Sequence, residues 1–145
     1  MYYFLSIVSN VGDDLGNPEL EWGRITIFLI LALGVSFLCS LLEAIILSVT
    51  WSHIEILSKD DKRSGKRLKE LKEDIDVPLA AILTLNTISH TIGAAGVGSE
   101  FNKLGNEWFT VASIILTILI LVFSEIIPKT LGAIYWKRLA PSSAY

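Results

Sequence analysis

The 145-residue sequence has very little of what most small enzymes and metal centres use. It contains one cysteine, Cys39, and two histidines. A lone cysteine cannot form an internal disulfide, and the chain offers no thiolate set for zinc or copper. No nucleophile–base pair and no glycine-rich phosphate loop can be recognised, so we expect no enzyme activity. We also expect no nucleic-acid partner.

Charge is scarce along three long stretches of the chain. Hydrophobic residues make up 52% of the sequence, and they concentrate in Ile25–Leu42, Val77–Val97 and Trp108–Ile127. Each stretch holds about 20 residues, enough for a helix rising ~1.5 Å per residue to cross a hydrocarbon core ~30 Å thick. The sequence therefore predicts an all-α membrane protein with three transmembrane helices, which we place at residues 25–51, 77–98 and 108–135.

The positions of the basic residues predict the orientation in the membrane. Seven Lys and Arg residues lie between Lys59 and Lys72, and Lys137 and Arg138 follow the third stretch. Membrane proteins carry an excess of such residues on the cytoplasmic side. We therefore expect a single transmembrane domain with its N-terminus outside the cell and its C-terminus inside, in a multi-pass protein of the cell membrane. Its parts outside the spans are an external segment at 1–24, a cytosolic loop at 52–76 and the start of a cytosolic tail at 136–145.

The first eleven residues are apolar but differ from a cleaved signal peptide. They lack a positively charged start and a small-residue cleavage site. We expect them to lie at the outer membrane interface, where the aromatic side chains of Tyr2, Tyr3 and Phe4 would anchor them.

The charged loop at 52–76 carries apolar residues at helical spacing on both sides of Gly65. This pattern fits either a helical hairpin interrupted at Gly65 or a continuation of the first span beyond the membrane. Pro78 is expected near the start of the second span, because proline is common in the first turn of a helix. The turn of about ten residues between the second and third spans makes them an antiparallel pair.

Polar residues inside the predicted spans are the main functional signal. An ionisable residue within a membrane is costly and usually faces a bundle interior or a watery cavity. The first two spans each carry polar or small residues at positions i, i+4 and i+7, which is one face of a helix. These residues are Ser36, Ser40 and Glu43 in the first span, Asn86, His90 and Gly93 in the second, and Ser124 and Glu125 in the third.

The oxygen atoms of these side chains favour a hard cation such as Mg²⁺, Ca²⁺ or Na⁺. Pro128 has no N–H, so the carbonyl of Ser124 is expected to lose its usual helical partner and to add another oxygen ligand. Simpler roles are open as well. The two serines of the first span could bond carbonyls of their own helix, and Glu43 could reach the interface or pair with Lys137.

Three sequence motifs resemble the transmembrane domain of the CNNM/CorC family, the cyclin M-like magnesium transporters. SFLCSLLEA at residues 36–44 is similar to the family's two serines followed by Glu-Thr-Ala. LNTISHTIGAA at residues 85–95 is similar to its asparagine motif. SEIIPKT at residues 124–130 is similar to its Glu-hydrophobic-hydrophobic-Pro-Lys-Thr signature. The order and spacing of the motifs agree over about residues 25–141.

The resemblance implies a homodimer with a short juxtamembrane helix and a dehydrated Mg²⁺ in a cytosol-facing cavity. It also implies Na⁺-coupled export, so Na⁺ is a possible second ion. When the family's site residues are matched to this sequence one by one, the resemblance implies that Ser40, Asn86 and Glu125 are the metal ligands, with Ser36 and His90 nearby. Many members of the family have a second asparagine where His90 stands, and nitrogen is a poor ligand for Mg²⁺. The family's cytosolic nucleotide-binding CBS pair is absent from the 145 residues and is expected to follow them.

Two functions from different classes remain open on the sequence. One is a cation transporter with Mg²⁺ as its substrate. The other is a dimeric membrane module or Mg²⁺ sensor that transports nothing and signals to a cytosolic domain or partner. Flux of Mg²⁺ into vesicles would distinguish them.

Overall fold

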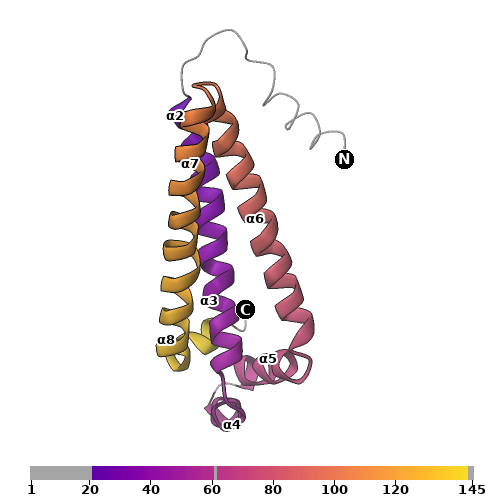
Figure 1. Ribbon diagram of the computed structural model, residues 1–145. Helices are drawn as coiled ribbons and strands as arrows, with labels where there is room; N and C mark the ends of the chain where they lie inside the picture. The colour runs from indigo at the N-terminus through magenta and orange to yellow at the C-terminus, as the bar shows by residue number, and fades with distance from the viewer. Residues whose placement is uncertain (1–20, 61, 144–145) are drawn as a thin grey trace, which may run out of the picture.

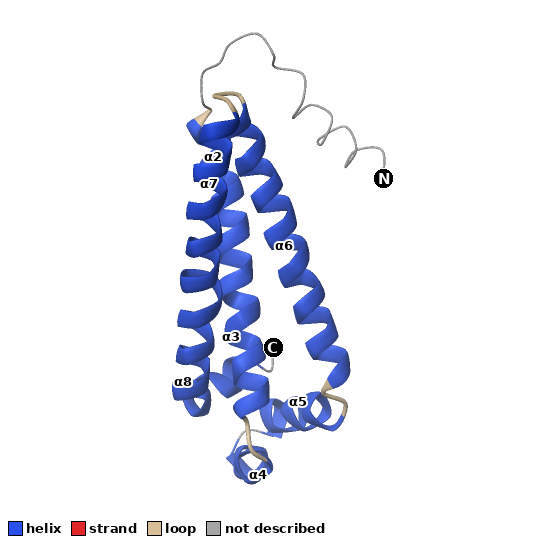
Figure 2. Cartoon of the chain, in the orientation of Figure 1, coloured by secondary structure: helices blue, strands red, loops and turns tan. Residues whose placement is uncertain are grey.

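The computed structural model describes residues 21–60 and 62–143, and within these ranges every regular element is a helix. The expected interfacial segment at residues 1–11 lies outside the described residues. In chain order the elements are α2 (Trp22–Ile30), η1 (Leu31–Val35), α3 (Ser36–Ser48), α4 (Trp51–Asp60), α5 (Lys62–Glu73), α6 (Asp76–Asn102), α7 (Asn106–Leu119), η2 (Ile120–Ile126) and α8 (Ile127–Ser143). Figure 2 shows that only short turns connect them.

Three continuous helical stretches are long and apolar enough to cross a membrane. They are span one, Trp22–Ser48, and span two, Asp76–Asn102, with 27 residues each, and span three, Asn106–Ser143, with 38 residues. Helices suit this environment because they satisfy their backbone hydrogen bonds internally, where no water can do so. The fold class predicted from the sequence is confirmed, whereas the orientation in the membrane stays a prediction.

The hairpin, α4 with α5, is confirmed as the structure of the charged loop, and the alternative of a continued first span is wrong. Val49 adopts an extended conformation with ψ 128° and ends span one before Trp51, the limit expected from the sequence. Gly65 does not interrupt the hairpin but lies inside α5. A Cβ atom there would stand 2.5 Å from the Cα of Ser58, so Gly65 lets α5 approach α4 closely.

The turn between spans two and three is shorter than the ten residues expected. Span two continues to Asn102, and only Lys103–Gly105 separate it from α7. Gly105 has φ +111°, a conformation that glycine adopts without strain and that lets the chain reverse here. We call this end of the bundle the loop end, and the opposite end, which carries α4 and α5, the hairpin end (Figure 1).

Buried apolar residues fasten the hairpin to spans one and three. They form a single cluster made of Ile45, Val49, Ile54, Leu68 and Ala140. Lys72 of α5 adds polar contacts, since its Nζ donates to the carbonyl of Ile46 at 3.0 Å and to that of Leu47 at 3.4 Å. A cation is favourable at this position because the C-terminal end of a helix carries partial negative charge.

Span two packs closely at the loop end and diverges from span one toward the hairpin end, as Figure 1 shows. A Cβ on Gly93 would lie 2.2 Å from the Cβ of Ala32, and one on Gly96 would lie 2.3 Å from the ring of Phe28. Small residues of this kind let helices approach one another in lipid. The fully buried residues of α6 all fall between Ser89 and Glu100, so its first half has no such packing.

Candidate cation site within the bundle

Three residues, one from each span, lie next to one another in a chain of polar contacts. Ser36 Oγ and His90 Nε2 are hydrogen-bonded at 2.5 Å. The other ring nitrogen, His90 Nδ1, lies 4.0 Å from Glu125 Oε1. The structure therefore brings together three of the five residues that the sequence placed at or near the metal site. His90 stands between the other two and faces both with its ring.

The remaining two residues, Ser40 and Asn86, hold buried oxygen atoms without a hydrogen-bond partner. Neither Ser40 Oγ nor Asn86 Oδ1 is paired in the described part of the chain. Spans one and two run in opposite directions, and Ser36 meets His90. One turn toward the hairpin end, the helical repeat therefore places Ser40 and Asn86 at the same level. The orphan oxygens thus belong to the face that carries the Ser36–His90 contact.

The hydrogen bonding of Ser36 and Ser40 shows whether these two serines bond only their own helix. Most threonine hydroxyls in the spans donate to the carbonyl four residues earlier in their own helix, as Thr87 does to Leu83 at 2.9 Å. Ser36 instead bonds across to span two, and Ser40 has no partner. The alternative that both serines only bond their own helix is therefore wrong.

Two wide helical turns with π geometry lie beside the site. η1 immediately precedes Ser36, and η2 contains Ser124 and Glu125. Such turns often occur at functional sites because they displace side chains from the regular helical register. Pro128 is buried just after η2, and the N–H of Ile127 bonds the carbonyl of Val122, five residues earlier. The free carbonyl expected at Ser124 stays a prediction.

The carboxylate of Glu43 belongs to an ion pair rather than to the oxygen cluster. Its Oε2 lies 3.2 Å from Nζ of Lys129 in α8. The expected alternative partner, Lys137, instead lies with its Nζ 5.6 Å from the ring centroid of Trp136. An ion pair was one of the two structural roles expected for Glu43, and the expected partner, Lys137, was wrong. Pairing with Glu43 also holds Lys129 in place, so this cation is not free to neutralise Glu125.

The donor set is dominated by neutral oxygens. Within the described residues no group of three His, Cys, Asp or Glu side chains is placed to hold a metal ion. Two hydroxyls, one amide, one imidazole and one carboxylate remain, from Ser36, Ser40, Asn86, His90 and Glu125. Oxygen atoms of these kinds suit hard cations and exclude a site selective for soft metals.

A buried carboxylate that the sequence did not reveal lies at the loop end. Glu100 is 0% exposed, and its two oxygens lie 3.3 Å from Arg24 Nε and 2.9 Å from Lys103 Nζ. The predicted second span ended at residue 98, which left Glu100 in the turn before the third span. The spacing of Glu100 and Lys103, which suits a helical i, i+3 pair, was the signal that span two continues past Gly98.

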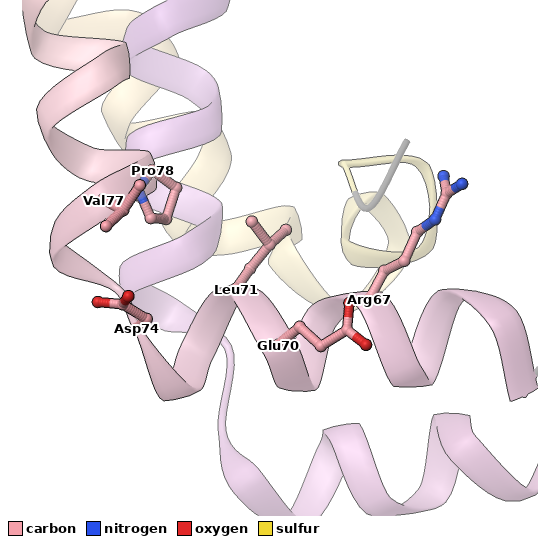
Figure 3. Close-up of a pocket in the computed structure, with 6 residues that line it drawn as sticks. All are labelled: Arg67, Glu70, Leu71, Asp74, Val77 and Pro78. Atoms are coloured by element: carbon pink, nitrogen blue, oxygen red, sulfur yellow. The ribbon is translucent and has the colours of Figure 1, made fainter.

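A surface hollow of about 340 Å³ opens between α5 and the start of α6 (Figure 3). Acidic, basic and apolar side chains line it together: Arg67, Glu70, Leu71, Asp74, Val77 and Pro78. None of the five predicted ligands is among them. The hollow is thus separate from the oxygen cluster.

Comparison with known proteins identifies related sequences. Residues 26–145 match the sequence model of the cyclin M transmembrane N-terminal domain, CNNM. The UPF0053 protein sll1254 of Synechocystis sp. is 39% identical over 115 residues, which is 79% of this chain and 33% of the relative. A UPF0053 protein of Haemophilus influenzae is 30% identical over 121 residues, 82% of this chain and 29% of the relative. The UPF0053 inner membrane protein YfjD of Escherichia coli is 29% identical over 90 residues, 61% of this chain and 21% of the relative. The chain thus spans a third or less of these relatives.

Proposed function

Because the chain belongs to the cyclin M transmembrane (CNNM) family, we propose that it carries Mg²⁺ across a membrane through the oxygen cluster between its three spans. The observation that carries this proposal is the pair of buried, unpartnered oxygens on Ser40 and Asn86. A buried polar atom without a partner is costly, and native proteins almost always satisfy such atoms. A cation that binds after losing its water would pair with both.

Glu125 supplies the negative charge in this proposal. Its carboxylate lies beside His90, and the nearest lysine in the sequence, Lys129, is paired with Glu43. An ionised carboxylate inside a membrane needs a compensating charge. A bound cation provides it, whereas Ser36 and His90 hold the wall of the site next to the carboxylate.

The site lies in the part of the bundle where span two diverges, so ions would enter from the hairpin end. We place this end in the cytosol because its hairpin carries the dense group of Lys and Arg residues. The proposed cycle is Na⁺-coupled export by a homodimer in the cell membrane. A location in the inner membrane, the term in the name of the Escherichia coli relative, agrees with this proposal.

Purified protein in sealed vesicles tests the proposal. A Mg²⁺-sensitive dye would report flux with and without a Na⁺ gradient, for the parent protein and for Asn86→Ala. Thr87→Ala is the matched control, since this neighbouring hydroxyl bonds only its own helix. We expect Na⁺-dependent flux in the parent and control and none in Asn86→Ala. Mg²⁺ binding without flux under any gradient would overturn transport and favour the non-transporting module or sensor.

A further inference from the structure

Two serines outside the proposed ligand set bond the wide turn of span one. Ser89 Oγ donates to the carbonyl of Leu31 at 2.7 Å, and Ser124 Oγ donates to the carbonyl of Leu33 at 3.0 Å. Both serines are buried, and they come from spans two and three. Each immediately precedes a residue of the oxygen cluster in the sequence. The two hydroxyls therefore approach η1 from both neighbouring spans.

These contacts differ from the threonine hydroxyl contacts of the spans. Thr84, Thr117 and Thr130, for example, donate to the carbonyl four residues back in their own helix. Ser89 and Ser124 instead bond carbonyls that are 58 and 91 residues away in sequence. A hydroxyl that bonds its own helix is satisfied wherever the helix moves. A hydroxyl that bonds another helix is satisfied in only one arrangement.

The serine hydroxyls add to the backbone hydrogen bonds of this wide turn, in which the N–H of Ser36 bonds the carbonyl of Leu33. A π turn holds one more residue than an α turn and shifts the backbone hydrogen bonds out of their regular pattern. No water is present in the hydrocarbon to satisfy the displaced carbonyls. If the turn tightened to α geometry, the helix beyond it would rotate by about 100° and move by about 1.5 Å relative to the helix before it. Helix α3, which carries Ser36 and Ser40, begins directly after the turn. Its rotation would move both serines away from the face that meets span two.

We propose that Ser89 and Ser124 are positioning residues that keep η1 wide and thereby set the rotation of α3 relative to α2. The consequence for Mg²⁺ rests on the proposed function: this rotation turns the oxygens of Ser36 and Ser40 toward the site. The role proposed for Ser89 and Ser124 needs only the hydrogen that each hydroxyl donates to a carbonyl of span one.

Gly34 offers a specific rescue. It lies within η1, and a Cβ added to it would meet nothing within 4 Å. Removing one residue from a π turn leaves an α turn with the flanking helices in their original register. Deletion of Gly34 should therefore preserve the site and make the two serine hydroxyls dispensable.

The first test measures helix rotation and does not depend on Mg²⁺. Pairs of spin labels on exposed positions, Ile27 with Ile114 and Leu47 with Ile134, report on α2 and α3 respectively. Distances would be measured in a Cys39→Ala background, so that only the introduced cysteines are labelled. In the Ser89→Ala/Ser124→Ala variant we expect at least one pair to shift by several ångström. Unchanged distances for both pairs would overturn the proposal.

The second test adds the deletion of Gly34 to the Ser89→Ala/Ser124→Ala variant. We expect both label distances to return to the parental values. If the double variant does not fold, the deletion should restore folding, since it removes the need for the hydroxyls. A triple variant that stays shifted or unfolded, while the Gly34 deletion alone folds normally, would contradict the proposal. A deletion that does not fold even with both serines present would also contradict it.

The Mg²⁺-dependent rise in unfolding temperature separates this inference from the proposed function. The double alanine variant should lose this rise and the triple variant should regain it, which loss of packing alone would not produce. If the label distances behave as expected and the parent protein shows no response to Mg²⁺, the positioning role stands and the proposed function fails.

Discussion

The loop end and the hairpin end of the bundle treat buried polar groups in opposite ways. At the loop end, small residues bring span two against span one, and the buried carboxylate of Glu100 lies within ion-pair distance of two cations, although its Oε1 accepts no hydrogen bond among the described residues. Toward the hairpin end, span two contributes no fully buried residue before Ser89. There the oxygens of Ser40 and Asn86 are buried without partners.

The contrast separates structural polar groups from groups available to a ligand. A paired charge inside a tightly packed region stabilises one arrangement of the helices. A buried oxygen without a partner costs stability unless something binds it. On this argument the loop end has a structural role, and the hairpin half of span two holds the proposed site. Each prediction below tests one side of this contrast.

The largest effect on stability should come from Glu100→Gln at the loop end. Breaking a fully buried ion pair costs about 3–5 kcal/mol, and we expect about 2–3 kcal/mol here because the cations can still reach water. Arg24 and Lys103 keep 24% and 20% side-chain exposure. Glu43→Gln is the control at the hairpin end, with an expected loss of about 0–1 kcal/mol. Thermal unfolding in detergent would measure both, and equal losses would remove the contrast.

Gly93→Ala should cause the next largest loss of stability, because the added Cβ would lie 2.2 Å from the Cβ of Ala32. Overpacking of this kind costs about 1–3 kcal/mol, partly offset by the about 0.5–1 kcal/mol that alanine gains over glycine in a helix. We expect a net loss of about 1–2 kcal/mol in the free energy of unfolding. Gly23→Ala has nothing within 4 Å of its Cβ and should be neutral or stabilising. A Gly93→Ala protein as stable as Gly23→Ala would show that the loop end is not tightly packed.

His90→Asn should act on Mg²⁺ affinity with little effect on stability. It replaces a ring nitrogen beside Ser36 with an amide oxygen, which is a harder ligand. We expect binding about fivefold tighter, or close to 1 kcal/mol, by isothermal titration with Mg²⁺. His53→Asn is the control, because that ring packs on Trp136 outside the site. Weaker binding in His90→Asn would mean that the imidazole itself shapes the site.

Lys72→Met should have the smallest effect on stability, and this effect should be confined to the hairpin end. It removes the ammonium that bonds the last carbonyls of α3, an interaction of about 0.5 kcal/mol at a helix terminus. Hydrogen exchange of α5 amides should become faster, while that of α7 stays unchanged. Lys66→Met, an exposed control paired only with Glu70 in its own helix, should leave both unchanged. Faster exchange in α7 would mean that the two ends are coupled.

The sequence predicted the features that depend on local pattern. Apolar runs located the three spans because a membrane requires about 20 such residues in each helix. The i, i+4 spacing placed Ser36 with Ser40 and Asn86 with His90 on shared helix faces, and the structure indeed pairs Ser36 with His90.

Features that depend on contacts between distant segments could not be predicted in the same way. Nothing local to Glu43 indicates that its partner is Lys129, since the packing of α3 on α8 decides which lysine is near. The same holds for the wide turn η1, whose carbonyls at Leu31 and Leu33 accept hydrogen bonds from serines of other spans. Glu100 was missed because its burial depends on where Arg24 of span one lies.

The most direct test of the central claim compares Glu125→Gln with Glu100→Gln in the Mg²⁺-dependent rise of the unfolding temperature. A ligand that binds only the folded protein raises its stability, so this rise reports binding. The account predicts that Glu125→Gln unfolds at the parental temperature without Mg²⁺ and shows no rise with it. It predicts that Glu100→Gln unfolds at a lower temperature and retains the full rise. A Glu125→Gln protein that Mg²⁺ stabilises as much as the parent would contradict the account, because the cation would then bind elsewhere.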